Sequence, residues 1–393
     1  MTRVIKIIAT MLLFASGNLY AQSPTPSRGF NLIVVGDPQP QTEAQIVDLE
    51  RDIIPEIGAI VEEYKSSGYP TAILLTGDVV WDTMEYLPRV KALFEELGVP
   101  VYAVIGNHDH DRAIDGNEPL AESHYIETFG ERYYTFAMGD TRLFALDNID
   151  YENYDSYSIG ISREQLRWLR RELRQLDDNQ RIAILMHAPA VDYRTGEALP
   201  YAKRLIRLAK GRELHFVTGH RHRHATADIT ATTIEHSVAQ VNGNLWFAPM
   251  CSDGTPRGVL CIEERDDVWM WQHRLLGGPT NKALIVWQES ETKNYEDNII
   301  AKVIGWDKMW RVEWMENGEN RGAMEHIEIC DPGYMHYVEH EAQYEDIIMQ
   351  RLRRSAHPNK GYFRCRRTEP NSHISIIATD RFGRQYRWDS ASK

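Results

Sequence analysis

Short apolar runs alternate with longer amphipathic segments between Phe30 and about Ile206, and this alternation restricts the fold more than any other feature of the sequence. The apolar runs are rich in Val, Ile and Leu and alternate little with polar residues, which is typical of strands buried on both faces. We expect six such strands, at Phe30–Val35, Thr71–Thr76, Val101–Ile105, Arg142–Leu146, Arg181–Met186 and Leu214–Thr218. Helices are expected between them, at Glu43–Lys65 (with a kink or break at Pro55), Thr83–Leu97, Arg163–Leu176 and Leu199–Ala209. This order predicts an α/β fold in which helices cover the sheets.

The pattern changes in the last third of the chain. Asn244–Met250 and Gly258–Ile262 resemble paired strands around the turn Ser252–Pro256, and Leu276–Asn281 resembles a linker. Short β-like runs follow, at Ala283–Trp287, Ile299–Ile304, Trp310–Trp314, His373–Ala378 and Gln385–Trp388. We therefore expect one domain over residues 28–275 and a small all-β sandwich domain over residues 281–393.

The first 21 residues resemble a secretory signal peptide. Arg3 and Lys6 form a short basic region, Ile7–Ala15 is apolar, and Leu19–Ala21 provides a small residue for cleavage before Gln22. The apolar run is shorter than the ~20 residues that a membrane-spanning helix needs, and we expect no transmembrane segment elsewhere. The sequence thus predicts an exported protein, periplasmic or extracellular.

The charge of the chain restricts its partners. With 57 acidic and 44 basic residues the formal net charge is −13, which argues against a broad nucleic-acid surface because such a surface needs a basic stripe. An anionic substrate remains possible, since bound metal ions can supply local positive charge.

Polar side chains follow five of the expected strands, at the point where each strand ends. They are Asp37 and Gln39, Asp78, Asn107 and His108, His187, and His220 and His222. Ligand sites in open α/β sheets lie at the carboxyl ends of the strands. A glycine precedes the polar residue in four of the five, as a sharp turn or a close approach to an ion requires. One such residue is usually a cap or a turn residue, but the whole set in this order indicates a metal site.

The order Gly-Asp, Gly-Asp, Gly-Asn-His-Asp, His and Gly-His-Arg-His resembles the calcineurin-like metallophosphoesterase superfamily, over about Phe30–Arg274. The more specific likeness is to its Asp-Pro-Gln branch, whose exported bacterial members carry a β-rich C-terminal domain. The segments that carry this likeness are Asp37–Gln39, Trp246–Pro249, Asp253–Gly258 and Asn281–Asp389. The resemblance implies a sandwich of two mixed sheets flanked by helices, and hydrolysis of a phosphate monoester or diester.

The resemblance also implies a dinuclear metal site. One cation would have Asp37, Gln39 and His222 as ligands, the other would have Asn107, His187 and His220, and Asp78 would bridge both. Oxygen and imidazole donors without thiolate suit Mn, Fe, Zn or Mg. A water between the two cations would lose its proton and attack phosphorus as a metal-bridging hydroxide, while His108 would protonate the leaving oxygen as general acid.

Two positions depart from the commonest motifs of the superfamily. Gln39 stands where Asp-x-His has histidine, and because an amide oxygen is a poorer donor than imidazole, we expect the cation at Asp37 to be bound more weakly. Trp81 occupies the last position of Gly-Asp-x-x-Asp and Asp82 follows it, so the motif assigns no carboxylate to orient His108.

Eight residues near these motifs are candidates for substrate contact, although a turn or core role is an alternative for each. They are Trp81, Asp109, His110, Tyr151, Tyr154, His224, His236 and Asp253. The expected substrate is a phosphorylated small molecule or polymer.

Two other functions remain open: a catalytically silent protein that uses the metal site to bind a phosphorylated ligand, and a non-haem iron oxygenase. The second needs only two His and one carboxylate, so seven ligands argue against it.

Overall fold

The computed structural model describes residues 29–153, 155–278 and 282–391. The expected signal peptide and Tyr154 lie outside these residues. None of the helices in this described part of the chain combines the length and the apolar character that a membrane crossing requires.

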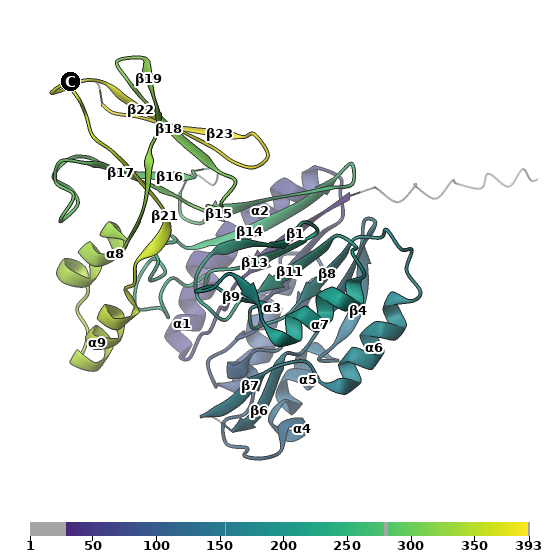
Figure 1. Ribbon diagram of the computed structural model, residues 1–393. Helices are drawn as coiled ribbons and strands as arrows, with labels where there is room; N and C mark the ends of the chain where they lie inside the picture. The colour runs from purple at the N-terminus through teal and green to yellow at the C-terminus, as the bar shows by residue number, and fades with distance from the viewer. Residues whose placement is uncertain (1–28, 154, 279–281, 392–393) are drawn as a thin grey trace, which may run out of the picture.

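The first of two large sheets has the strand order β15-β14-β1-β2-β3 (Figure 1). Its strands are β1 (Gly29–Val35), β2 (Thr71–Leu75), β3 (Val101–Ala103), β14 (Gly258–Arg265) and β15 (Val268–Leu275). The first three run parallel, whereas β14 runs antiparallel to β1. The outer face of this sheet is covered by α1 (Glu43–Asp48), α2 (Ile54–Ser66) and α3 (Leu87–Glu95), which bury one continuous apolar cluster against it.

The second sheet has the order β12-β13-β11-β8-β5-β4. Its strands are β4 (Tyr134–Met138), β5 (Thr141–Ala145), β8 (Ile182–Leu185), β11 (Leu214–Thr218), β12 (Ala225–Thr230) and β13 (Thr233–Ser237). The four inner strands are parallel and the two edge strands antiparallel. α6 (Arg163–Leu173) and α7 (Pro200–Ala209) cover its outer face through a cluster that includes Leu169, Leu205 and Phe216.

The two sheets pack face to face. Phe30, Leu74 and Val217 belong to the fully or almost fully buried apolar cluster between them. The order helix, sheet, sheet, helix explains why the inner strands are apolar on both faces: one face meets the other sheet and one meets helices. The expected two-sheet sandwich flanked by helices is confirmed.

Smaller elements complete this part of the chain. They are the short helices α4 (Glu118–Ala121) and α5 (Ser123–Phe129), the hairpin of β6 (Ile149–Asn153) and β7 (Ser156–Ile159), and the hairpin of β9 (Val191–Asp192) and β10 (Glu197–Ala198). The helix expected at Glu43–Lys65 is interrupted by a π-helical turn at Leu49–Ile53, and α2 begins at Ile54, one residue before Pro55.

The strand expected at Asn244–Met250 is wrong. Leu245 and Trp246 have φ of 53° and 66°, a left-handed conformation that a strand cannot contain. The segment is irregular, and only Met250 makes an isolated bridge, to Pro256. Gly258–Ile262 is a strand as expected, but its partners are β1 and β15 rather than Asn244–Met250.

The C-terminal region contains two antiparallel four-stranded sheets, ordered β16-β17-β21-β20 and β19-β18-β22-β23. The strands are β16 (Leu284–Trp287), β17 (Ile299–Val303), β18 (Arg311–Glu316), β19 (Glu319–Ala323), β20 (Glu325–Ile329), β21 (Asn359–Cys365), β22 (Ile374–Thr379) and β23 (Gln385–Asp389). Their shared apolar core confirms a β-rich region. It is not all-β, however, because α8 (Pro332–His336) and α9 (Asp346–Ser355) lie between β20 and β21.

Two cationic side chains, one partly and one fully buried, connect this region to the part of the chain that forms the two large sheets. Arg381 pairs with Asp228 of β12 at 3.0 Å and with Asp307 at 2.8 Å. Lys302 of β17 donates to the carbonyl oxygen of Asp253 at 2.8 Å and pairs with Asp331 at 3.2 Å. Each cation thus satisfies groups from both parts of the chain.

Candidate metal centre

The polar residues predicted at strand ends converge on one edge of the two sheets. β1 and β2 bring Asp37 and Asp78 there, β8 brings His187, and β11 brings His220. Two hydrogen bonds link the sheets at this edge. The backbone N–H of His220 donates to Asp37 Oδ2 at 2.9 Å, and His187 Nδ1 donates to the carbonyl oxygen of Thr76 at 2.8 Å.

Five of these residues form two overlapping groups of three. Asp78, His187 and His220 make the first, and Asp37, Asp78 and His222 the second, each with one ligand atom per residue and all three atoms within 4.8 Å of one another. His187 Nε2 lies 3.3 Å from Asp78 Oδ1, and His222 Nε2 lies 3.3 Å from Asp37 Oδ2. Asp78 belongs to both groups, as a carboxylate that bridges two cations must.

The surroundings of His187 fit a cation. Its Nδ1 donates its proton to Thr76, so in the neutral ring Nε2 carries a lone pair. That lone pair faces Asp78 Oδ1 at 3.3 Å, Asn107 Oδ1 at 3.2 Å and His220 Nδ1 at 3.1 Å. A positive charge among these atoms, from a proton on the ring or from a bound cation, would stabilise them. Mixed oxygen and imidazole donors of this kind could hold a divalent metal ion.

The pKa values reflect the same crowding. Burial lowers the pKa of His187, but the Asp78 carboxylate outweighs it and raises that pKa to about 9. Burial conversely raises the pKa of Asp78, and the imidazoles of His187 and His108 bring it well below its usual range. The buried carboxylate is thus held in its charged form.

The backbone at this edge is strained. Asp37, Gln39, Asp78, His220 and His222 have φ of 34°, 44°, 47°, 68° and 55°, a region that residues other than glycine seldom adopt. Strain of this kind persists where the surrounding structure enforces it, and it is concentrated at functional sites. Five of the seven predicted ligands share it.

Two of the glycines that precede the polar residues leave room for the carboxylates. A Cβ at Gly106 would clash with Asp78 Oδ1 and its backbone nitrogen, and a Cβ at Gly219 would clash with Asp37 Oδ1. The close contact predicted at these glycines is therefore present. The atoms that approach the two glycines belong to Asp78 and Asp37.

Gln39 lies in the cluster, but its amide is turned away from a ligand role. Its Nε2 donates to Asp78 Oδ2 at 2.8 Å, and its Oε1 accepts from Gln240 Nε2 at 2.5 Å. Gln240 is oriented in turn by the backbone N–H of Leu245, which donates to its Oε1 at 3.1 Å. In this arrangement Gln39 steadies the Asp78 carboxylate.

Two residues that position the Asp37–Gln39 turn were not predicted. Gln240 holds the Gln39 amide, and Asn242 Nδ2 donates to the carbonyl oxygen of Pro38 at 2.8 Å. Both follow β13, which lies parallel to β11 and therefore ends at the same edge. The available signal was the polar residues at alternate positions 240, 242 and 244.

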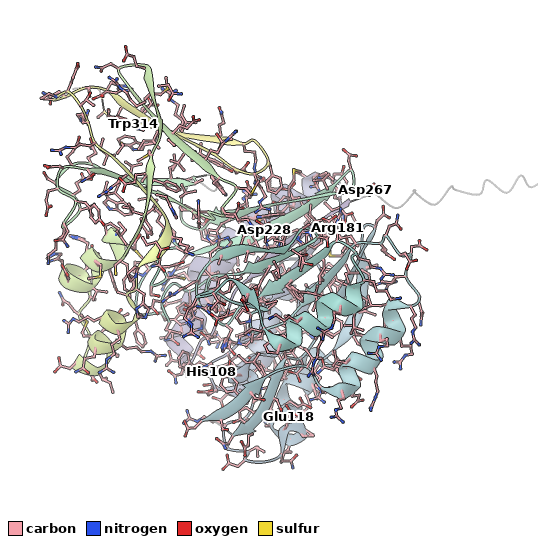
Figure 2. All side chains as sticks on the ribbon, in the orientation of Figure 1. His108, Glu118, Arg181, Asp228, Asp267 and Trp314 are labelled. Carbon is pink, nitrogen blue, oxygen red and sulfur yellow. The ribbon has the colours of Figure 1, made fainter. Side chains whose placement is uncertain are left out.

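His108 has a carboxylate partner that the motif did not assign. Its Nδ1 donates to Asp82 Oδ1 at 2.7 Å, and its backbone N–H donates to Asp78 Oδ1 at 2.9 Å. Burial lowers the pKa of His108, but the charges of Asp78 and Asp82 more than compensate and raise it. Trp81 stacks on the imidazole with a centroid separation of 4.4 Å. Figure 2 shows His108 at the lower end of the sheets.

Among the substrate-contact candidates in the described part of the chain, only Trp81 lies beside the Asp and His residues of the candidate metal centre. Asp109 is fully buried and accepts hydrogen bonds from the backbone N–H groups of Val80 and Gly106, so it fastens the two loops together. His110 donates to the carbonyl oxygen of Gly106 at 2.9 Å and stacks on Tyr151 at 4.6 Å, and both rings are buried. In the structure these three side chains make their contacts within the loop, and substrate contact by them stays a prediction.

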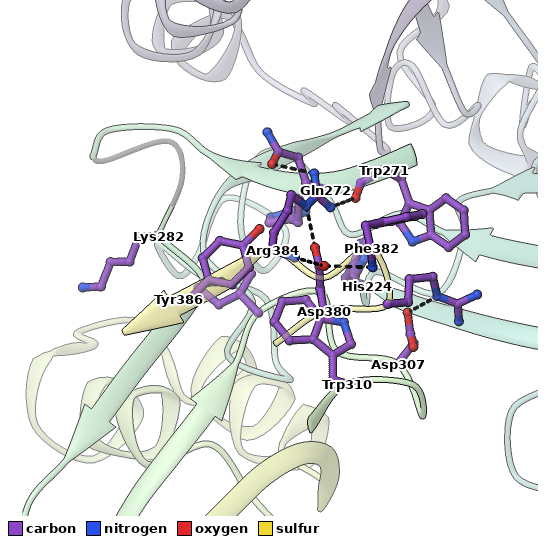
Figure 3. Close-up of a pocket in the computed structure, with 15 residues that line it drawn as sticks. His224, Trp271, Gln272, Lys282, Asp307, Trp310, Asp380, Phe382, Arg384 and Tyr386 are labelled. Atoms are coloured by element: carbon purple, nitrogen blue, oxygen red, sulfur yellow. Dashed lines mark hydrogen bonds and ion pairs between the residues drawn. The ribbon is translucent and has the colours of Figure 1, made fainter. Parts of the chain in front are cut away.

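Three further candidates lie away from the cluster. His236 is fully buried and bonded to His215 at 3.0 Å, and the Asp253 carboxylate accepts from Thr255 within its own turn. His224 lies against His273 and lines a cavity between the large sheets and the C-terminal region (Figure 3). Figure 3 also shows Arg384 linking Asp380 to Gln272 across that cavity. Tyr157, on β7, lies closer, with its ring 6.2 Å from that of His220.

Two family models match the chain. Residues 30–224 match the model described as calcineurin-like phosphoesterase, and residues 235–386 match the model described as the C terminal of calcineurin-like phosphoesterase. No curated protein matches the chain.

The chain is also similar to several solved structures at low sequence identity. A dimetal phosphatase from Danio rerio is 13% identical, with 62% of this chain and 95% of that chain covered and a TM-score of 0.44. The purple acid phosphatase PPD1 from yellow lupin (Lupinus luteus) seeds is 16% identical, with 64% and 53% covered and a TM-score of 0.47. A 5′-nucleotidase from Candida albicans is 12% identical, with 63% and 51% covered and a TM-score of 0.40.

Proposed function

We propose that this chain, which carries a calcineurin-like phosphoesterase domain followed by the C-terminal domain of that family, hydrolyses phosphate monoesters or diesters with two bound divalent cations. The observation that carries the proposal is the convergence of acceptor atoms around His187 Nε2 and Asp78 Oδ1, described above. Such a set of acceptors suits divalent cations.

The proposed ligands fall into two sets that share Asp78. Asp37 and His222 would hold one cation, with Gln39 as a further ligand once its amide turns, and Asn107, His187 and His220 would hold the other. Two bound cations would supply positive charge for the phosphoryl oxygens and lower the pKa of a water molecule that attacks phosphorus. Asp78 would contact both cations, since it belongs to both groups of potential ligands.

His108 is the proposed general acid. Asp82 accepts the Nδ1 proton, which leaves Nε2 to deliver a proton to the leaving oxygen. The carboxylate of Asp82 also favours the protonated imidazole, as a general acid requires. Trp81, stacked on the ring, holds its plane.

The test uses 4-nitrophenyl phosphate and bis(4-nitrophenyl) phosphate with the full chain, after chelator treatment and after addition of Mn. We expect hydrolysis of at least one of the two esters, abolished by chelation and restored by Mn. Metal binding without turnover would indicate a binding protein, and consumption of O₂ by the Fe-loaded chain would indicate an oxygenase; either result would contradict the proposal.

We propose further that the protein is exported after cleavage before Gln22. The support is the basic, apolar and small-residue order of residues 1–21. N-terminal sequencing of the protein recovered from the periplasm or medium should start at Gln22. An intact Met1 in cytosolic material alone would contradict export.

A further inference from the structure

The helical segment of the C-terminal region is fastened to the loop that supports the Asp37–Gln39 turn. Tyr334 of α8 is fully buried and its hydroxyl accepts from Asn244 at 2.7 Å, while Tyr337 donates to the carbonyl oxygen of Phe247 at 2.9 Å. Leu352 of α9 belongs to the same apolar cluster as Ala248. These contacts hold α9 in a fixed position relative to the Asp and His residues of the candidate metal centre. It lies on the side of the molecule where α1 lies (Figure 1).

From this helix Arg351 reaches the edge of the candidate site. Its guanidinium carbon lies 4.9 Å from the ring centroid of Trp81, and that ring stacks on His108. Trp81 thus contacts both the guanidinium of Arg351 and the imidazole of His108, the proposed general acid. In the sequence, Arg351 and His108 are separated by more than half of the chain. The side chain of Arg351 is exposed, so solutes can reach it.

We propose that Arg351 is a substrate-binding residue supplied by the C-terminal region, and that it recognises a second anionic group on the leaving-group side of the substrate. The substrate class is a phosphate ester or anhydride whose leaving group itself carries a phosphate or carboxylate. This inference rests on the proposed function, because it takes His108 as the residue that protonates the leaving oxygen.

The direction follows from the order of the groups. A leaving group whose oxygen receives a proton from His108 would lie on the side of the site that Trp81 and Arg351 of α9 border. A guanidinium that stacks by its face presents N–H donors in its plane, and this planar fork binds carboxylate or phosphate oxygens in pairs. Arg112, whose Nη1 lies 3.5 Å from Asp82 Oδ2, adds a second positive charge beside the same residues.

The charge of the whole chain strengthens the inference. With a net charge of −13 the protein repels anions at long range, so a doubly anionic substrate needs local cations besides the metals. Arg351 supplies one at the edge where the leaving group would lie.

The test compares phenyl phosphate with 4-carboxyphenyl phosphate, which differ only by a carboxylate on the leaving group. In the Mn-loaded full chain we expect kcat/KM to be higher for the carboxylated ester. Arg351→Met should lower the ratio of the two kcat/KM values by about tenfold, mainly through KM, as expected for one charge-assisted hydrogen-bonded contact. Arg351→Lys should keep part of the preference.

Arg353→Met is the matched control. Arg353 is exposed on the same helix, and two residues further along it points to the other side; this variant should keep the wild-type ratio. A ratio equal in wild type and Arg351→Met, with both proteins equally thermostable, would overturn the inference. If the folded wild type hydrolyses neither ester with Mn, the proposed function fails instead.

A binding measurement separates the two failures without turnover. Inorganic pyrophosphate carries a second anionic group, whereas orthophosphate does not. Arg351→Met should weaken pyrophosphate binding to the Mn-loaded protein about tenfold more than it weakens orthophosphate binding, as titration calorimetry would show. Equal weakening of both anions would mean that Arg351 acts only through the general charge of the site.

Discussion

His108 and Asp82 form a 2.7 Å hydrogen bond from imidazole Nδ1 to carboxylate Oδ1. Asp82 follows the last position of the expected Gly-Asp-x-x-Asp motif, which Trp81 occupies. Asp82 has a φ of 58°, and its backbone N–H donates to the carbonyl oxygen of His108 at 3.1 Å. The left-handed turn brings the displaced carboxylate back to the imidazole, so the pair forms despite the altered spacing.

The first prediction concerns this pair. Asp82→Asn should lower kcat by about 10–100-fold, and His108→Ala by about 10²–10⁴-fold, while metal content stays unchanged in both. Because Asp82 acts through His108, adding Asp82→Asn to His108→Ala should cost little more. Full multiplication of the two losses would show that Asp82 has a separate role, and loss of metal in His108→Ala would make His108 a ligand.

The second prediction concerns Gln39. A ligand role requires its amide to turn, which exchanges the hydrogen bond to Asp78 for a metal bond and displaces Gln240 from its Oε1. Gln39→His provides imidazole, a better donor for Zn, Fe and Mn, so it should tighten the weaker of the two metal positions and shift the metal preference towards Zn or Fe. Metal titrations of both proteins, followed by activity and elemental analysis, check this. Equal affinities would leave Gln39 with only its contact to Asp78.

The third prediction is a pH dependence of stability away from the metal cluster. Burial raises the pKa of Asp147 from 3.8 to about 7. The folded chain therefore holds this proton after the unfolded chain has released it, so the contribution of Asp147 to stability is greatest at low pH and is lost as the pH rises from about 4 to 7. Relative to wild type, Asp147→Asn should gain about 1–3 kcal/mol of unfolding free energy across that range.

Urea unfolding of the two proteins between pH 4 and 8 measures this difference. The control is Asp150→Asn, an exposed aspartate three residues further along the chain, which should shift the unfolding free energy equally at every pH. A pH-independent difference between Asp147→Asn and wild type would contradict the raised pKa.

The fourth prediction concerns the junction with the C-terminal region. Arg381→Met removes the partner of two carboxylates, of which Asp307 has a side chain only 1% exposed. Loss of one member of such a buried pair is strongly destabilising, and because Arg381 is itself 12% exposed we expect a cost of about 2–4 kcal/mol. Arg366→Met removes an ion pair between exposed side chains and should cost less than about 1 kcal/mol. Similar costs for the two variants in thermal unfolding would contradict a buried connection.

The inner strands and the metal cluster could be predicted because their signals are local. A run of apolar residues predicts a buried strand. The glycine and polar residue that follow it predict which side chain lies at the carboxyl end of that strand. Asp37, Asp78, His187, His220 and His222 come together because parallel strands end at a common edge.

The missed features depend on contacts between distant segments or on a single dihedral angle. Gln240 contacts Gln39 across 201 positions, and Arg351 reaches Trp81 from another region of the chain. The hydrogen bond between Asp82 and His108 depends on the left-handed backbone conformation of Asp82 itself. The strand expected at Asn244–Met250 failed for the same reason, since Leu245 and Trp246 adopt positive φ that their identities do not signal.

The central claim is that Asp78 bridges two cations, and anomalous diffraction from crystals grown with Mn tests it most directly. We predict two Mn positions less than about 4.5 Å apart, consistent with other two-metal sites, both in contact with the Asp78 carboxylate, with His187 and His220 at one ion and Asp37 and His222 at the other. A single Mn position at saturating metal, or two positions with Asp78 turned away from either ion, would contradict the account.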